Sequence, residues 1–201
     1  MDHPTKKKIK LEALQLFAAR GFDATTMNEV AARVGVTKPA VYTYFAGKED
    51  LVLSILQEIR EEYGRYMECV MDEAEQLQTT ERQLHHLFEQ YIRYFLEHIW
   101  ISAFWVRIIF FPPPALKQKL ALHMNDTEFQ FLKRLKAIIK KAMASGEIRQ
   151  TDADTLALSF YAMREGVLMT FAQKVGKPSI DGIWQNFWLG IKGGDNEPAD
   201  K

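Results

Sequence analysis

The stretch that decides the fold of this chain reads Thr26-Met-Asn-Glu-Val-Ala-Ala-Arg-Val-Gly-Val-Thr-Lys-Pro-Ala-Val-Tyr-Thr-Tyr-Phe45. Apolar residues recur in its first half at the spacing of a helix. They are Met27, Val30, Ala31 and Val34. Thr26 and Glu29 match the S/T-x-x-E capping box that starts a helix. Gly35 follows directly and suits the left-handed end of that helix.

A second short helix is predicted after a tight turn. Val36 fills the turn, Thr37 can cap the next helix, and Val41 and Phe45 lie on its inner face. Two helices joined by a three- to four-residue turn with glycine form the helix-turn-helix pattern. Its usual use is to place the second helix in the major groove of DNA.

Composition sets the limits of the remaining chain. Of the 201 residues, 47% are hydrophobic, so a sizeable core is available. The formal net charge is zero, which argues weakly against a nucleic-acid binder. Residues 1–50 hold eight Lys and Arg against six Asp and Glu, so this part is mildly basic.

Cellular location is predicted from cysteine usage and from the apolar segments. Cys69 is the single cysteine, which fits a reducing cytoplasm, and we interpret it as a small residue that packs between helices. Residues 1–10 have no apolar stretch of the kind found in a signal peptide. The most apolar segment, residues 99–111, is too short to span a bilayer, so a buried helix is expected.

Helical periodicity runs through nearly the whole chain and predicts an all-α fold of about nine helices. We expect a helix-turn-helix domain over residues 1–47, a helical bundle for ligand binding and dimerisation over 48–192, and a disordered tail over 193–201. The predicted helices cover residues 5–20, the two helices within 26–45, 48–78, a helix after Thr80, 100–111, a helix ending near Ser145, 152–175 and 179–192.

Several segments resemble the TetR/AcrR family of bacterial transcriptional repressors. They are Arg20-Gly-Phe-Asp-Ala-Thr-Thr-Met, Glu-Val-Ala-Ala-Arg-Val-Gly-Val, Val41-Tyr-Thr-Tyr-Phe and Gly47-Lys-Glu-Asp-Leu51. They occur in order at the family's spacing over roughly residues 8–55. The rest of the chain resembles the family only in length and helical pattern, so the ligand cannot be inferred from it.

The resemblance implies two groups of DNA contacts. Thr26, Tyr42 and Lys48 would hold phosphates, and Tyr44 stands where the family often has His, although a phenol can also donate to a phosphate. The residues that would face the groove are Thr37, Lys38, Pro39, Ala40 and Thr43. Lys38 is the only long donor on this helix and suits a guanine edge. The alternative is an ordinary helical corner in which the two tyrosines are core residues.

The basic run of Lys6, Lys7, Lys8 and Lys10 leaves two interpretations open. It can form a flexible arm that reaches a flanking groove of the DNA, or it can be the solvated start of a helix.

The middle helices carry many aromatic residues, which suit a small-molecule cavity between helices but equally a plain core. The residues we assign to an effector site are Tyr63, Tyr66, Met67, Phe88, Tyr91, Phe95, Phe104, Arg107, Ile108, Arg164 and Glu165. A buried charge must be paired or functional. Arg107 therefore either meets an anionic ligand or pairs with Glu165. A lipophilic cation with Glu165 as counter-charge is the alternative ligand.

The last two helices are predicted to form a dimer surface. The helix over residues 179–192 is apolar nearly all round and needs cover on more than one side. The predicted contact residues are Phe160, Met163, Val167, Phe171, Trp184, Phe187 and Trp188. Burial within the monomer is the alternative.

The sequence thus predicts a homodimeric, ligand-responsive transcriptional repressor. Its partners would be a palindromic double-stranded DNA operator, a small apolar effector and a second copy of the chain, with no membrane. The histidines lack the spacing of metal ligands, so no metal and no cofactor are predicted. A regulator that acts without an effector is one alternative. A helical enzyme is another, although no nucleophile–base pair or phosphate loop supports it.

Overall fold

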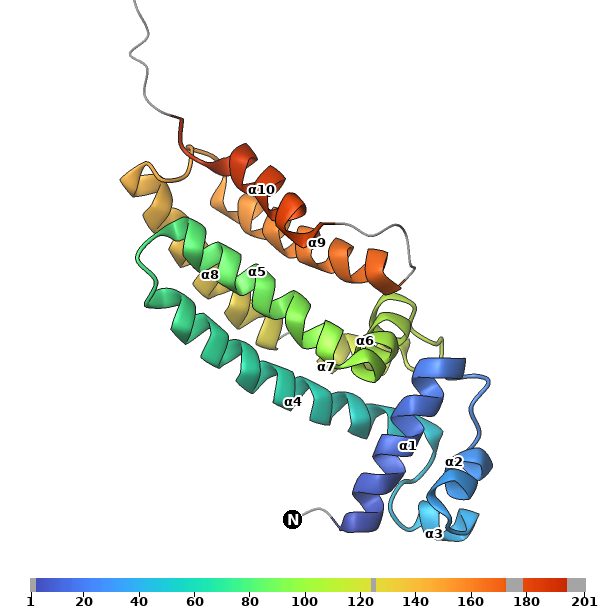
Figure 1. The fold of residues 1–201 in the computed structure, drawn as a ribbon. Coiled ribbons are helices and arrows are strands. Elements are labelled where there is room, and N and C mark those ends of the chain that lie inside the picture. Colours follow the sequence, from blue (N-terminus) through green and yellow to red (C-terminus); the bar gives the residue numbers. More distant parts are fainter. Residues whose placement is uncertain (1–2, 124–125, 173–178, 195–201) are drawn as a thin grey trace, which may run out of the picture. The chain divides into compact units, whose positions relative to one another are not determined.

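The computed structural model describes residues 3–123, 126–172 and 179–194. Within these ranges it contains ten α-helices and one π-helical segment, and its strand-like pairing is limited to an isolated bridge between Ile148 and Lys192 (Figure 1). The prediction of an all-α fold is confirmed.

The N-terminal helices lie close to where the sequence places them. They are α1 (Pro4–Arg20), α2 (Met27–Val34), α3 (Lys38–Tyr42) and the long α4 (Lys48–Glu75). Pro4 stands in the first turn of α1, where its missing N–H costs nothing. The helix ends at Gly21, whose φ of 84° favours glycine.

The later helices differ from the prediction in number. They are α5 (Thr80–Glu97), α6 (Ile99–Trp105), the π-helical η1 (Val106–Phe110), α7 (Lys117–His123), α8 (Asp126–Ser145), α9 (Ala153–Ala172) and α10 (Ile180–Ile191). The helix predicted over residues 100–111 is thus α6 followed by η1, and α7 is a separate short helix. The predicted extension of α9 to residue 175 falls outside the described residues, as does the predicted tail from residue 195.

The chain divides into two compact units. The first unit comprises Met1–Tyr66 and Phe95–Asn125, and the second comprises Met67–Tyr94 and Asp126–Lys201. The expected functional boundary near residue 47 therefore lies inside the first unit.

The core of the first unit forms around α1. Phe17 is 1% exposed and lies 6.2 Å from the ring of Phe22 and 6.4 Å from that of Phe104 in α6. Val30 from α2 and Val41 from α3 are fully buried. This burial holds the two short helices in the core, and they depend on it, since helices of eight and five residues are too short to be stable alone.

The second unit is built from α8, α9, α10 and parts of α4 and α5. Phe88 of α5 and Phe160 of α9 are fully buried and contact the aromatic residues of α10. Gly193 is the first residue of the predicted disordered tail. Its N–H donates to the carbonyl of Glu147 at 2.9 Å, so the tail is held by a hydrogen bond at this residue. Cys69 is exposed on α4, so the predicted packing role of this residue is wrong.

The helices in the described part of the chain were compared with the requirements for crossing a membrane. None of its helices combines the length and the apolar character needed to cross a bilayer.

Candidate nucleic-acid interface

The turn between α2 and α3 has the local geometry that the sequence predicts. The side chain of Thr26 accepts from the Glu29 backbone N–H at 3.2 Å, and the Glu29 carboxylate accepts from the Thr26 N–H at 2.9 Å. These hydrogen bonds lower the pKa of Glu29, the backbone bond from Thr26 being the largest cause. Gly35 adopts a left-handed φ of 80°, and its N–H bonds the carbonyls of the last turn of α2. The chain therefore reverses sharply and starts α3 under the cap of Thr37.

Helix α3 presents one face to solvent. Val41 is fully buried and attaches the helix to the core, while Lys38, Pro39 and Tyr42 are exposed. The Lys38 ammonium lies 5.8 Å from the centre of the Tyr42 ring, and Tyr42 is 45% exposed. A cation and aromatic and apolar surface thus share the accessible side of a short helix. Tyr42 is not the core aromatic of the alternative interpretation.

The other predicted groove residues lie around this face. Thr37 and Thr43 are exposed, and Ala40 is half-buried. Thr43 donates its hydroxyl hydrogen to the Ala40 carbonyl at 2.7 Å, which fixes the hydroxyl at the end of α3. Thr26, predicted to hold a phosphate, is also exposed.

Two predicted phosphate contacts have partners within the first unit. The hydroxyl of Tyr44 lies 3.2 Å from Nδ1 of His3, and the two rings are 5.7 Å apart. The ammonium of Lys48 donates to the Phe22 carbonyl at 2.8 Å and lies 4.2 Å from the Phe22 ring. An ammonium has three donors, so this bond leaves others for a phosphate. Their DNA contacts stay predictions.

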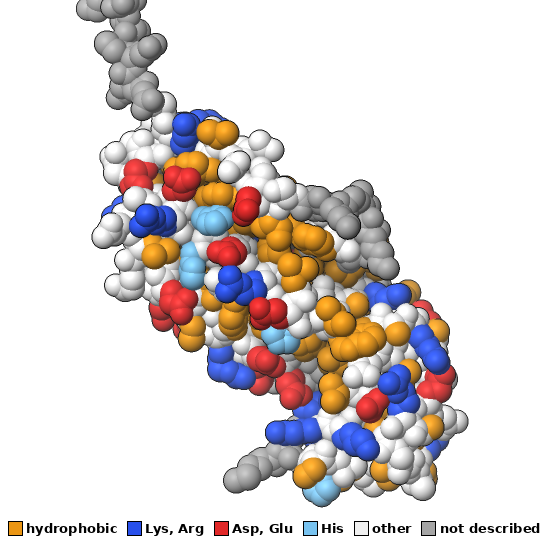
Figure 2. Space-filling model, in the orientation of Figure 1, with side chains coloured by type: hydrophobic (Ala, Val, Ile, Leu, Met, Phe, Trp, Pro, Cys, Tyr) orange, Lys and Arg blue, Asp and Glu red, His pale blue; other side chains and the backbone are white. Residues whose placement is uncertain are grey.

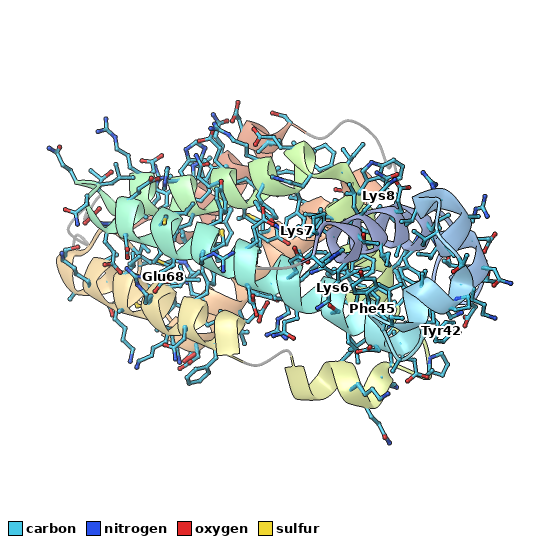
Figure 3. All side chains as sticks on the ribbon, turned by 90° about the horizontal axis from the view of Figure 1, so that it is seen from below. Lys6, Lys7, Lys8, Tyr42, Phe45 and Glu68 are labelled. Atoms are coloured by element: carbon cyan, nitrogen blue, oxygen red, sulfur yellow. The ribbon has the colours of Figure 1, made fainter. Side chains whose placement is uncertain are left out.

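The N-terminal lysines do not form a flexible arm, because α1 already starts at Pro4. Figure 3 shows Lys6, Lys7 and Lys8 along this helix. Lys8 donates to the last carbonyl of α2, Val34, at 2.9 Å, and Lys6 lies 5.9 Å from the Phe45 ring. The basic run is therefore a helical segment that is fastened to the helix-turn-helix.

The predicted effector residues of the first unit pack as a core. The ring of Tyr63 lies 5.6 Å from Phe95 and 6.2 Å from Trp105. Phe104 and Ile108 are also buried, and only Tyr66 is half-buried. These aromatic residues contact one another in the core of the first unit, and their assignment to an effector site stays a prediction.

Arg107 bonds backbone carbonyls of α1 in the structure, and its contact with an effector stays a prediction. It is exposed rather than buried, and its Nε donates to the carbonyl of Ala18 at 2.9 Å, at the end of α1. The predicted burial of Arg107 is wrong, because the residue lies in the π-helical segment η1, whose winding differs from the α-helical periodicity that the prediction assumed.

Three of the predicted effector residues of the second unit, Tyr91, Arg164 and Glu165, lie together around a buried charge. Arg164 is 3% exposed, and its guanidinium lies 4.2–4.5 Å from the ring centres of Tyr91, Phe131 and Tyr161. Its Nε is 3.5 Å from the carboxylate of Glu165. The other two, Met67 in α4 and Phe88 in α5, are buried, and Phe88 contacts Trp184.

Burial changes the acid–base behaviour of this cluster. Desolvation raises the pKa of Glu165, and the attraction of Arg164 opposes that rise. Desolvation and the neighbouring carboxylates raise the pKa of Tyr161 to about 12. A protonated Glu165 can donate a hydrogen bond, so the cluster can offer either a donor or a negative charge.

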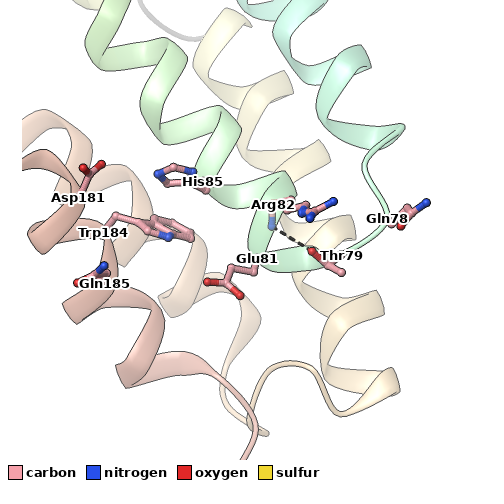
Figure 4. Close-up of a pocket in the computed structure, with 8 residues that line it drawn as sticks. All are labelled: Gln78, Thr79, Glu81, Arg82, His85, Asp181, Trp184 and Gln185. Atoms are coloured by element: carbon pink, nitrogen blue, oxygen red, sulfur yellow. Dashed lines mark hydrogen bonds between the residues drawn. The ribbon is translucent and has the colours of Figure 1, made fainter.

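Sequence reasoning missed two surface pockets. One, of about 610 Å³ in the second unit, has His85 and Trp184 on facing helices (Figure 4). The other, of about 250 Å³ in the first unit, lies among α1, α4 and α6. Neither is lined by a predicted effector residue, and Trp184 had been assigned to the dimer. The patterns offered no signal for either, since the lining residues lie far apart in the sequence.

Three predicted dimer residues are buried in the chain itself. Phe160, Val167 and Trp184 are at most 5% exposed. The Trp184 ring lies 5.0 Å from His85 and is stacked 6.1 Å from Trp188. Part of α10 is therefore covered within the monomer, which corrects the prediction for these three residues.

The remaining predicted dimer residues are partly accessible. They are Met163, Phe171, Phe187 and Trp188. The sequence missed the more exposed apolar residues of the same helices, Leu158 at 56% and Leu189 at 60%. Hydrophobic side chains gather over α10 and the adjoining part of α5 in Figure 2. Among the described residues, no group of three or more His, Cys, Asp or Glu is placed to hold a metal ion.

Helix α2 is capped by Thr26 and ends at Gly35, and the exposed helix α3 follows the turn. This arrangement defines a helix-turn-helix protein. The family model "Bacterial regulatory proteins, tetR family" matches residues 11–55, which contain this geometry. Over these residues the chain is a helix-turn-helix domain of the TetR type.

Known proteins resemble the chain at two levels. The transcriptional activator FasR of Mycolicibacterium smegmatis is 40% identical over 50 residues, which are 25% of this chain and 23% of that protein. The chain thus matches less than a quarter of that relative's length. The relatives named here are regulators rather than enzymes, as predicted.

Similar folds extend over nearly the whole chain. The fatty acid degradation regulator FadR of Bacillus halodurans has a TM-score of 0.71 at 19% identity, with 98% of each chain covered. AibR, solved with isovaleryl coenzyme A and operator DNA, has a TM-score of 0.70 at 20% identity, with 94% of this chain and 98% of that chain covered. At this identity the likeness concerns the fold alone.

Proposed function

We propose that the protein is a ligand-responsive transcriptional repressor that binds a palindromic operator as a homodimer. The observation that carries the proposal is the face of α3, where Lys38, Pro39 and Tyr42 are exposed while Val41 attaches the helix to the core. A cation beside apolar and aromatic surface on a short helix that follows a capped turn suits the major groove of DNA.

The exposed groups divide into two kinds of DNA contact. Lys38, Pro39, Ala40, Thr37 and Thr43 are on or beside α3 and would face base edges. Lys38 suits the acceptors of guanine, and the ring carbons of Pro39 suit a thymine methyl. The hydroxyl and ammonium groups at the helix ends would hold phosphates, which fix register rather than sequence. These are Thr26, Tyr42, Tyr44 and Lys48.

Homodimerisation would supply the second recognition helix. Two copies of α3 in successive major grooves lie about 34–36 Å apart. We place the contact on the exposed faces of α9 and α10, which lie side by side with Phe160 against Phe187 at 5.8 Å (Figure 1). Leu158 and Leu189 supply exposed apolar area there, and among the described residues no atom outside the helix's own backbone lies within 4 Å of a Cβ added at Gly166. A partner helix can therefore approach α9 closely.

The effector would be small and largely apolar, and we place its polar recognition at Arg164 and Glu165 in the second unit. A charge that is 3% exposed among three aromatic rings is costly to bury, and this cost supports a binding role for Arg164. A carboxylate ligand would pair with Arg164, and an amine with Glu165. A thermal-shift screen of acids and amines separates these classes, because Arg164→Met should lose acids and Glu165→Gln should lose amines.

The proposal is tested by selecting binding sites from a pool of random DNA duplexes. The wild-type chain should enrich an inverted repeat with half-sites about 10–10.5 base pairs apart or a multiple of that spacing. Lys140→Ala, which removes an exposed lysine on α8 of the second unit, serves as the control and should enrich the same sequence. Enrichment of no sequence would refute operator binding, and an unrepeated motif would refute the dimeric site.

A further inference from the structure

The end of α1 is closed by a side chain from a distant part of the sequence. The last carbonyls of a helix have no partner within it and attract cations. Arg107 supplies Nε to Ala18 at 2.9 Å and Nη2 to Ala19 at 3.4 Å, from 88–89 positions further along the chain. The local basic residue Arg20 does not serve this end, since it pairs with Glu29 at 2.7 Å.

The same junction between α1 and α2 receives two more side-chain donors. Lys48, at the start of α4, donates to the Phe22 carbonyl at 2.8 Å. Thr25 donates to the Gly21 carbonyl at 2.8 Å. A Cβ at Gly21 would lie 3.6 Å from Nη1 of Arg107, so the guanidinium covers this turn closely. The loop that leads into the helix-turn-helix is thus held by α4 on one side and by η1 on the other.

Arg107 reaches this junction because of the π-helical turn that contains it. η1 follows α6 without a break and holds one more residue per turn than an α-helix, so it rotates the side chains after Trp105. If η1 rewound as α-helix, each of its residues would turn by about 20° more than the one before, so Arg107, its second residue, would turn by about 40° relative to α6. Its bonds to α1 would then be lost. All these residues belong to the first unit.

We propose that Arg107 is a positioning residue that couples η1 to the DNA-binding helices, so that rewinding η1 releases α1 and lowers the affinity for the operator. The proposal rests on the proposed function, and it adds the residue and the segment through which regulation acts. Val106 and Ile108 on either side of Arg107 are buried, so a shift of η1 repacks the core at the same time. That repacking makes two discrete arrangements more favourable than a gradual drift.

Coupling between two sites is reciprocal, which allows a test without an effector. The probe is the duplex that the protein enriches from the random pool, and the readout is amide hydrogen exchange of residues 99–111 by mass spectrometry. In the wild-type protein, DNA should slow exchange in this segment by about fivefold or more, the lower end of typical coupling. In Arg107→Met, DNA should still bind while this protection disappears. If Arg107 had only a structural role, Arg107→Met would change the exchange rate of the free protein, but DNA would still slow exchange in residues 99–111.

The controls separate the possible failures. Arg93→Met removes an exposed arginine whose partner, Glu89, is on its own helix, and it should keep the protection. Arg107→Lys retains the positive charge but lacks the planar guanidinium with its several donors. This variant should therefore keep part of the protection by DNA. If DNA binds but leaves residues 99–111 unchanged in the wild type, or if Arg107→Met retains the full protection, Arg107 does not couple the two. If no duplex is enriched, the proposed function is itself wrong.

Discussion

Replacing Leu158 with glutamate tests the proposed dimer surface, because this residue lies on α9 with 56% of its area exposed. Burying a whole leucine stabilises by about 1.5–3 kcal/mol, so covering this fraction contributes about 0.8–1.7 kcal/mol per copy. A two-fold dimer buries both copies, which gives about 1.7–3.4 kcal/mol. At 1.4 kcal/mol per factor of ten, Leu158→Glu should raise the dimer dissociation constant by about 20- to 300-fold or more.

The assay is sedimentation equilibrium at micromolar concentrations in reducing buffer. Leu11→Glu is the matched control, since Leu11 on α1 is 54% exposed and lies outside the proposed surface. Urea unfolding at low protein concentration checks that both monomers stay folded. An unchanged dissociation constant for Leu158→Glu, or an equal increase for Leu11→Glu, would show that the interface lies elsewhere. The double replacement of Trp184 and Trp188 is not a clean test, because Trp184 belongs to the monomer core.

Two further predictions concern DNA recognition and pH. Lys38→Ala should lose about 1–3 kcal/mol of preference for the enriched duplex over random DNA. Tyr42→Phe should weaken both DNAs alike, and competition titrations at several salt concentrations check both variants. Equal losses for Lys38→Ala on the two DNAs would make Lys38 a phosphate contact. Glu165 has a folded-state pKa raised above its ordinary value of 4.5, so the native state binds more protons than the unfolded state in the window above pH 4.5. Stability should therefore fall as pH rises through that window, and Glu165→Gln should remove this slope in urea titrations between pH 4.5 and 7. A slope that persists in the variant would assign it to other groups.

The helix-turn-helix could be predicted from sequence because its determinants are local. Thr26 and Glu29 are three residues apart, and their capping box forms between neighbouring backbone groups whatever the rest of the chain does. Gly35 likewise meets a backbone requirement at its own position. The periodicity of Val30, Val34 and Val41 identified the inner faces that the structure buries.

Roles that depend on tertiary contacts could not be predicted in this way. Arg107 looked buried because its neighbours in sequence are apolar, but a π-helical turn directs it to the end of α1. Trp184 looked available to a partner because α10 is apolar all round, yet His85 and Phe88 of α5 cover it. Periodicity reports which face of a helix is apolar and does not report which part of the protein covers that face.

The exposed position of Cys69 on α4 has practical consequences for handling the protein. Because it is the only thiol in the chain, a maleimide dye or spin label attaches at one defined place without mutagenesis. The same accessibility allows two chains to join through a disulfide in air-exposed preparations. Such a covalent pair would sediment as a dimer whatever surface the chain uses for assembly, so oligomer measurements require reductant or a Cys69→Ser background.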